Sequence, residues 1–97
     1  MARGRMLNNK ISASRQVDDL PNDTCRLLAT WLIAHLDVNG VFYGEAIMVK
    51  SLVFPRRADV TLEDTEAYLR AMEDVGLIQR FERDGERWLW WPNFTEN

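Results

Sequence analysis

The stretch Leu77–Trp91, LIQRFERDGERWLWW, decides the fold. Asp84-Gly85 stands near its centre, and this dipeptide is a strong signal for a two-residue β-hairpin loop. The flanking residues are rich in aromatic and branched side chains, which favour strands. We therefore predict strands over residues 77–83 and 86–91, with Pro92 ending the second strand.

A loop at Asp84-Gly85 fixes the register, because Arg83 then lies opposite Glu86 and Phe81 opposite Trp88. Alternation along each strand sorts the side chains into two faces. One face holds Ile78, Leu89 and Trp91. The other holds Phe81, Trp88 and Trp90.

A helix is predicted immediately before the hairpin. It is expected to start near Asp59 or Thr61. Thr61 followed by Asp64 resembles a capping box, and Gly76 provides a stop. Apolar and small residues recur at three- and four-residue steps, which is typical of a helix packed on one side: Leu62, Thr65, Leu69, Met72 and Gly76. A further helix is predicted over residues 45–53, and it must end before Pro55. We expect residues 56–59 to form the turn between the two helices.

The first strong helix begins at the N-cap Asn22 and is expected to end at residues 38–40. Its predicted apolar face consists of Leu28, Trp31, Leu32 and Leu36, with Trp31 in the core. Val41-Phe42-Tyr43 follows as a short β-prone segment, and a single turn of helix is expected near residues 15–19.

The predicted order is helix, short strand, helix, turn, helix and hairpin. This order indicates an α+β, mainly helical fold of the winged helix-turn-helix class, with three main helices, a short strand and a C-terminal β-hairpin wing. The short strand is expected to pair with the hairpin as a third strand. We predict an N-terminal arm over residues 1–20, the domain over 21–94, and the start of a truncated linker over 95–97.

Composition limits the function classes. The chain has 97 residues, of which 46% are apolar, enough for one core. Cys25 is the single cysteine and His35 the single histidine, so an internal disulfide and a Cys/His zinc site are excluded. We interpret Cys25 as a small buried hydrophobe and His35 as a partly buried structural residue. With no glycine-rich phosphate loop, we expect no enzyme activity, cofactor or metal.

The longest apolar-rich run, residues 27–36, is shorter than the roughly 20 residues that a membrane helix needs. No signal sequence is visible at the N-terminus. We therefore expect a cytoplasmic protein without a membrane partner.

Charge is unevenly distributed, although the net charge is only −3. Basic residues fall on three separate predicted segments, the arm, the turn and the wing, which can converge on one duplex. The candidate DNA-binding residues are Arg3, Arg5 and Lys10 on the arm, Arg56 and Arg57 in the turn, and Arg80, Arg83 and Arg87 on the wing. For any one of these arginines, a solvated or paired surface charge is the competing interpretation.

The third predicted helix is acidic and would repel phosphate in a major groove. Its outward residues Glu63, Glu66 and Glu73 are candidates for a protein-partner surface instead. Phe81, Trp88 and Trp90 are candidates for an aromatic patch on the wing. This patch would serve as a dimer surface, a site covered by the arm, or a base-stacking platform for a single strand.

Several segments resemble, in order and spacing, the N-terminal domain of phage and prophage replisome organisers, which are related to DnaD-type primosomal proteins. The segments are Met1–Met6, Asp37–Gly40, Lys50–Pro55, Gly76–Ile78 and Trp91–Phe94. The resemblance implies a winged helix that acts in DNA replication initiation, by binding double-stranded DNA or by self-association. It also implies a C-terminal region that engages replisome proteins, so we expect that the chain is a fragment. An oligomerisation or protein-binding module and a winged-helix transcriptional repressor are the alternatives.

Overall fold

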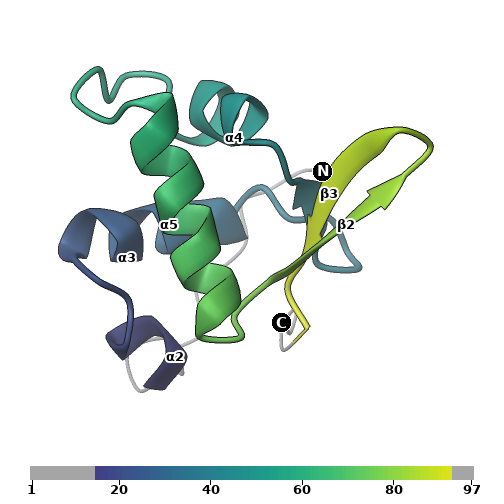
Figure 1. Cartoon of the computed structure of the whole chain (residues 1–97), viewed down its shortest axis with the longest axis horizontal. Helices are drawn as coiled ribbons and strands as arrows, with labels where there is room; N and C mark the ends of the chain where they lie inside the picture. The colour runs from purple at the N-terminus through teal and green to yellow at the C-terminus, as the bar shows by residue number, and fades with distance from the viewer. Residues whose placement is uncertain (1–14, 93–97) are drawn as a thin grey trace.

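The computed structural model describes residues 15–92. Within them the chain forms an α+β fold of four helices and one three-stranded antiparallel sheet. The elements in chain order are α2 (Arg15–Asp18), α3 (Asp23–Ile33), β1 (Val41–Tyr43), α4 (Ala46–Val53), α5 (Leu62–Asp74), β2 (Gln79–Arg83) and β3 (Glu86–Trp90). The helices lie together on one side of the molecule, and the β2–β3 hairpin extends away from them (Figure 1).

Helix α3 begins where predicted, since the side chain of Asn22 accepts a hydrogen bond from the backbone N–H of Cys25 at 2.8 Å. It ends at Ile33, earlier than predicted. The cause is local: Asp37 Oδ1 accepts hydrogen bonds from the backbone N–H groups of Asn39 and Val41 at 2.8 and 2.9 Å. This carboxylate stabilises a turn in competition with further helix.

Helices α4 and α5 follow the predicted pattern. The capping box at Thr61 is confirmed: its hydroxyl accepts from the Asp64 N–H at 2.9 Å, and the Asp64 carboxylate accepts from the Thr61 N–H at 3.1 Å. Residues 54–61 connect the two helices, and we call them the interhelical turn. Lys50 holds this turn, because its Nζ donates to the carbonyls of Phe54 and Arg57 at 3.3 and 2.9 Å.

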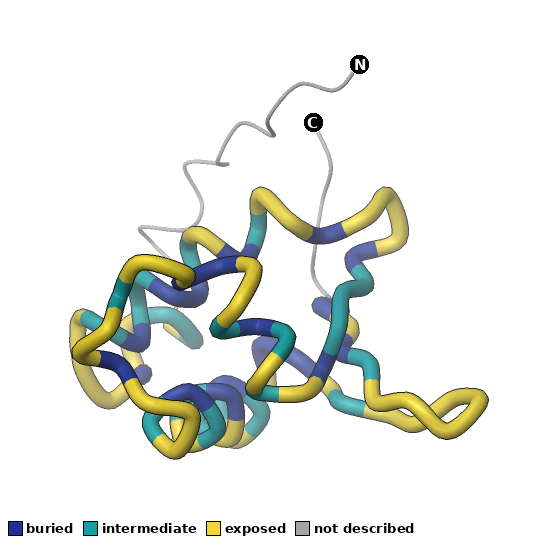
Figure 2. The backbone as a smooth tube through the Cα atoms, turned by 90° about the horizontal axis from the view of Figure 1, so that it is seen from above, coloured by how far each residue is buried: buried dark blue, intermediate teal, exposed yellow. Residues whose placement is uncertain are grey.

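The sheet has the order β1-β3-β2, so the short first strand pairs with the hairpin as predicted. Phe81 lies opposite Trp88 and Arg83 opposite Glu86, which confirms the register. Asp84 and Gly85 both have positive φ, 55° and 79°. Residues 82–87 project from the body and are exposed (Figure 2), and we call them the hairpin tip.

Beside the sheet, Gly44 touches the backbone of β3. A Cβ at this position would lie 2.6 Å from the carbonyl carbon and oxygen of Trp88. Only glycine allows this approach between the β1–α4 connection and β3.

The core lies between the helices and the inner face of the sheet. Ile78, Leu89 and Trp91, which were predicted to share one face, are all buried there. Two predictions are wrong. Trp31 is 43% exposed, although its ring makes a T-shaped contact with that of Phe54, at 5.0 Å between ring centroids. His35 is exposed because α3 ends before it, although its ring lies 5.6 Å from that of Phe42.

Candidate nucleic-acid interface

The predicted DNA-binding residues fall into three groups. Arg3, Arg5 and Lys10 lie outside the described residues. Arg56 and Arg57 lie in the interhelical turn, and Arg83 and Arg87 at the hairpin tip. Arg80 lies nearer the base of the hairpin, as the second residue of β2.

At the hairpin tip, Arg83 is exposed, and no hydrogen bond or ion pair engages its guanidinium within residues 15–92. Arg87 pairs loosely with Glu82, with 3.8 Å between Nη2 and Oε2, and the side chain of Glu82 is 73% exposed. An exposed pair at this distance contributes little and is easily exchanged. The tip therefore presents one unpaired and one weakly paired guanidinium.

In the interhelical turn, Arg56 is exposed, and its guanidinium has no partner in the part of the chain that the structure describes. Arg57 is more committed. Its Nη2 lies 3.1 Å from Asp59 Oδ2, and its guanidinium lies over the Phe54 ring, 5.3 Å from the centroid. The hydrogen bond from Arg57 lowers the pKa of the Asp59 carboxyl. Arg56 is therefore the more available cation of the turn.

Arg80 is placed differently from the sequence prediction of a DNA-contacting wing residue. Its side chain is only 7% exposed and binds α5 and the connection between β1 and α4. Nη1 and Nη2 donate to the two carboxylate oxygens of Glu66 at 2.9 and 2.7 Å, and Nε donates to Glu73 Oε1 at 3.1 Å. Nη1 also donates to the carbonyl of Gly44 at 3.1 Å. Because Arg80 is nearly buried against α5 and bound to two carboxylates, we no longer count it among the residues that could contact phosphate.

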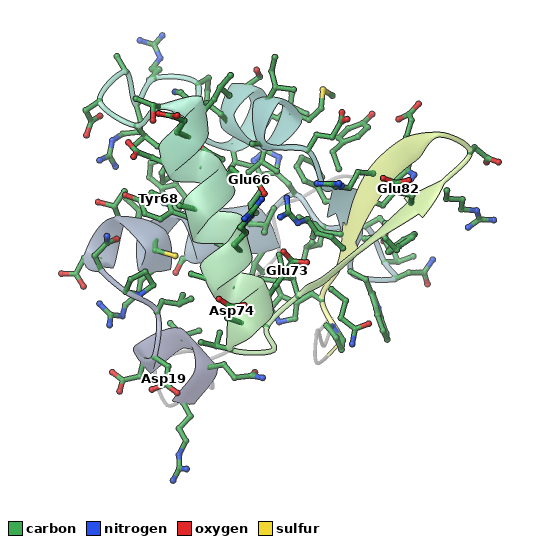
Figure 3. The ribbon with its side chains drawn as sticks, in the orientation of Figure 1. Asp19, Glu66, Tyr68, Glu73, Asp74 and Glu82 are labelled. Carbon is green, nitrogen blue, oxygen red and sulfur yellow. The ribbon has the colours of Figure 1, made fainter. Side chains whose placement is uncertain are left out.

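Glu66 and Glu73 were expected to face outward for a protein partner, and this expectation is wrong. Both point from α5 toward the hairpin, whereas Tyr68 lies on the side of the helix near α3 (Figure 3). The bidentate hydrogen bonds from Arg80 lower the pKa of Glu66 to about 2, and Glu66 and Glu73 together raise the pKa of Arg80. We call Arg80, Glu66 and Glu73 the hairpin anchor.

The remaining face of α5 still does not suit DNA. Glu63 and Asp74 are exposed, Asp64 is used in the capping box, and Arg70 pairs with Glu66 at 3.0 Å. The exposed charges of this helix are thus mainly negative, as predicted. A helix with this surface would repel phosphate.

The aromatic face of the hairpin is partly open. Phe81 is 38% exposed and Trp90 39%, while Trp88 is half-buried. Trp88 stacks on Tyr43 with 5.2 Å between ring centroids and an interplanar angle of 19°. The sequence prediction missed Tyr43, although pairing of residues 41–43 with the hairpin would have placed it opposite Trp88.

Cys25 is fully buried, as predicted, and burial raises the pKa of its thiol to about 11. Its Sγ donates to the Tyr68 carbonyl at 3.7 Å. No cluster of His, Cys, Asp or Glu within residues 15–92 has the arrangement of a metal site. A depression beside the anchor, bounded by Glu73, Arg80, Phe81, Glu82 and Arg87, mixes both charge signs and selects no ligand class.

Comparisons with known proteins leave the family open. The sequence matches no protein-family model, and searches of curated proteins and of solved structures also found no match. None of the helices between residues 15 and 92 has the length and apolar character that crossing a membrane requires.

Proposed function

We propose that this chain is a winged-helix domain that binds double-stranded DNA through its hairpin tip and its interhelical turn. The observation that carries the proposal is the state of two arginines. Arg83 and Arg56 are exposed and lack ion-pair partners among residues 15–92, each at a projecting part of the surface. Guanidinium groups in such positions suit phosphate oxygens.

The order of elements supports the winged-helix interpretation. Helices α4 and α5 with the turn between them correspond to a helix-turn-helix, and the β2–β3 hairpin corresponds to the wing. In that class the second helix usually enters the major groove, but the exposed acids of α5 oppose this. We therefore assign the DNA contacts to the wing and the turn. Contacts of this kind supply affinity and salt dependence rather than base selection.

The process that this binding would serve rests on the resemblance described for the sequence. We propose replication initiation of the phage or prophage type, in the cytoplasm of a bacterial host and together with replisome proteins. A winged-helix repressor is the competing process, and it predicts preference for a palindromic operator.

The test is titration of a labelled duplex by fluorescence anisotropy at increasing salt. Arg83→Ala with Arg87→Ala should reduce the slope of log affinity against log salt by about 1–2, and Arg56→Ala by about 1. Arg15→Ala is the matched control, since Arg15 is an exposed arginine on α2, far from the hairpin (Figure 1). Absence of duplex binding at low salt, or an equal loss with Arg15→Ala, contradicts the proposal.

A second candidate, self-association, is favoured by the partly open aromatic face. Phe81 and Trp90 expose more than a third of their surface at adjacent strands. Sedimentation velocity should then show a dimer that Trp90→Ser dissociates, while Trp31→Ser leaves it intact. A monomer at all concentrations would exclude this candidate.

A further inference from the structure

Besides the buried contacts of Ile78 and Leu89, a charged cluster joins the hairpin to the helices. Arg80 comes from β2, Glu66 and Glu73 from α5, and the Gly44 carbonyl from the connection between β1 and α4. One guanidinium thus spans three separate parts of the chain. Its planar fork fixes direction as well as distance, because each N–H must meet its acceptor in one plane.

The position of this cluster matters for the tip. Arg80 lies three residues before Arg83 on the same strand, so the anchor holds the last packed segment before the hairpin leaves the body. Beyond it, residues 81–87 are all exposed. The anchor sets the direction in which the tip projects from α5, together with the pairing of β3 with β1 and β2 and the contact of Gly44 with the Trp88 backbone.

The two carboxylates of the anchor lie on α5, the helix whose exposed acids would repel DNA. Glu66 and Glu73 are one-third exposed or less, at 29% and 32%, and both pair with Arg80. The negative charge of these two carboxylates is therefore balanced by Arg80 within the protein. The helix uses these acids to hold the basic hairpin.

From this geometry we propose that Arg80 is a positioning residue, which never touches DNA but fixes the hairpin tip at a set distance and angle from the interhelical turn. The consequence for DNA rests on the proposed function. If the domain binds a duplex, Arg83 and Arg56 act as two rigidly spaced phosphate contacts on it. A rigid spacing lowers the entropy lost on binding, because fewer arrangements of the tip must be excluded.

The first experiment measures the spacing without DNA. Nitroxide labels on Ala58→Cys in the turn and Glu86→Cys at the tip report the distance distribution by pulsed electron resonance. Both positions are exposed, whereas Cys25 is fully buried and stays unlabelled. The wild-type background should give a narrow distribution. The triple variant Arg80→Met, Glu66→Gln, Glu73→Gln removes the anchor without leaving an unpaired buried charge. It should increase the width of the distance distribution at least twofold.

Two further variants make this result specific. Arg80→Lys keeps the charge, but one ammonium cannot reproduce the fork, so we expect intermediate broadening. Arg70→Met removes the other, exposed partner of Glu66 and should leave the distribution narrow. Circular dichroism and cooperative thermal unfolding confirm the fold of each variant. An unchanged distribution in both the folded triple variant and Arg80→Lys overturns the positioning role.

The second experiment tests the consequence for DNA. The triple variant still carries Arg83 and Arg87, yet its salt slope should fall toward that of Arg83→Ala with Arg87→Ala. Adding those two substitutions to the triple variant should then reduce the slope little further. Full additivity would overturn the coupling of Arg80 to DNA binding. Failure of the wild-type protein to bind any duplex would refute the proposed function, and the label distances would still decide the positioning role.

Discussion

Arg80 and Arg83 stand three residues apart on one strand, and their surroundings differ in every respect. Arg80, near the base of the hairpin, is nearly buried and donates four hydrogen bonds to Glu66, Glu73 and the Gly44 carbonyl. Arg83, at the tip, is exposed and its guanidinium has no partner within the described residues. The comparison shows that the base of the hairpin is built for stability and that the tip is left available for contact. Four predictions would break or sharpen this distinction.

The largest effect is expected at the buried side of the hairpin. Leu89 is fully buried opposite Arg80, so Leu89→Ala should lower the free energy of unfolding by about 2–5 kcal/mol. Phe81→Ala, on the partly open face, should cost about 1 kcal/mol. Urea denaturation measures both. Equal losses would show that the two faces of the hairpin are not energetically distinct.

The contact between Gly44 and β3 should rank second. A methyl group there would collide with the Trp88 backbone, so Gly44→Ala should cost about 1–3 kcal/mol. Gly85→Asn is the matched control at the tip. Nothing lies within 4 Å of a Cβ at position 85, and asparagine tolerates the positive φ of this residue. In thermal unfolding, the midpoint temperature of Gly44→Ala should lie well below that of Gly85→Asn.

The anchor should give the protein a characteristic acid response. The folded-state pKa of Glu66 is about 2, below its ordinary 4.5, so its contribution is complete above pH 4.5 and is lost as pH falls toward 2. After allowance for solvent screening, the contribution is about 1–2 kcal/mol. Unfolding free energies measured from pH 5 to pH 2 should fall less steeply for Glu66→Gln than for the wild type. Glu63→Gln, on the same helix, should keep the wild-type slope, and a steep fall in Glu66→Gln would contradict this assignment.

The smallest effect on stability is expected at the tip. Arg83→Ala should change the free energy of unfolding by no more than about 0.5 kcal/mol, because its side chain contacts no partner among residues 15–92. The same substitution should reduce the salt slope of duplex binding by about 1. If Arg83→Ala lost stability but kept its affinity for the duplex, Arg83 would be a structural residue and the distinction between base and tip would be wrong.

Features that depend on neighbours a few residues away were predictable from the sequence. The N-cap at Asn22, the capping box of Thr61 and Asp64, and the hairpin loop at Asp84-Gly85 all appear as expected. Each follows from local backbone geometry, which residue type and spacing specify. Strand alternation then sorted the hairpin side chains into two faces, and the structure shows that the face of Ile78, Leu89 and Trp91 is the buried one.

The environment of single side chains was harder to predict. Trp31 fits a helical apolar period, yet 43% of its surface stays exposed although its ring contacts Phe54 in the interhelical turn. Helix α3 ended early because a side chain four residues beyond it, Asp37, binds two backbone N–H groups in a turn. In both cases the helical apolar period is present in the sequence, but a contact that this period does not describe decides the outcome.

The sequence alone therefore determined the order of the elements, the caps, the hairpin register and the acidic character of α5. Tertiary structure decided which charges are available. Strand alternation places Arg80 on the face of Leu89 and Arg83 on the opposite face, but only packing brings Glu66, Glu73 and the Gly44 carbonyl around Arg80. The reason is physical. Local rules act over three or four residues, whereas Arg80 meets partners 7 to 36 positions away that only the folded chain brings together.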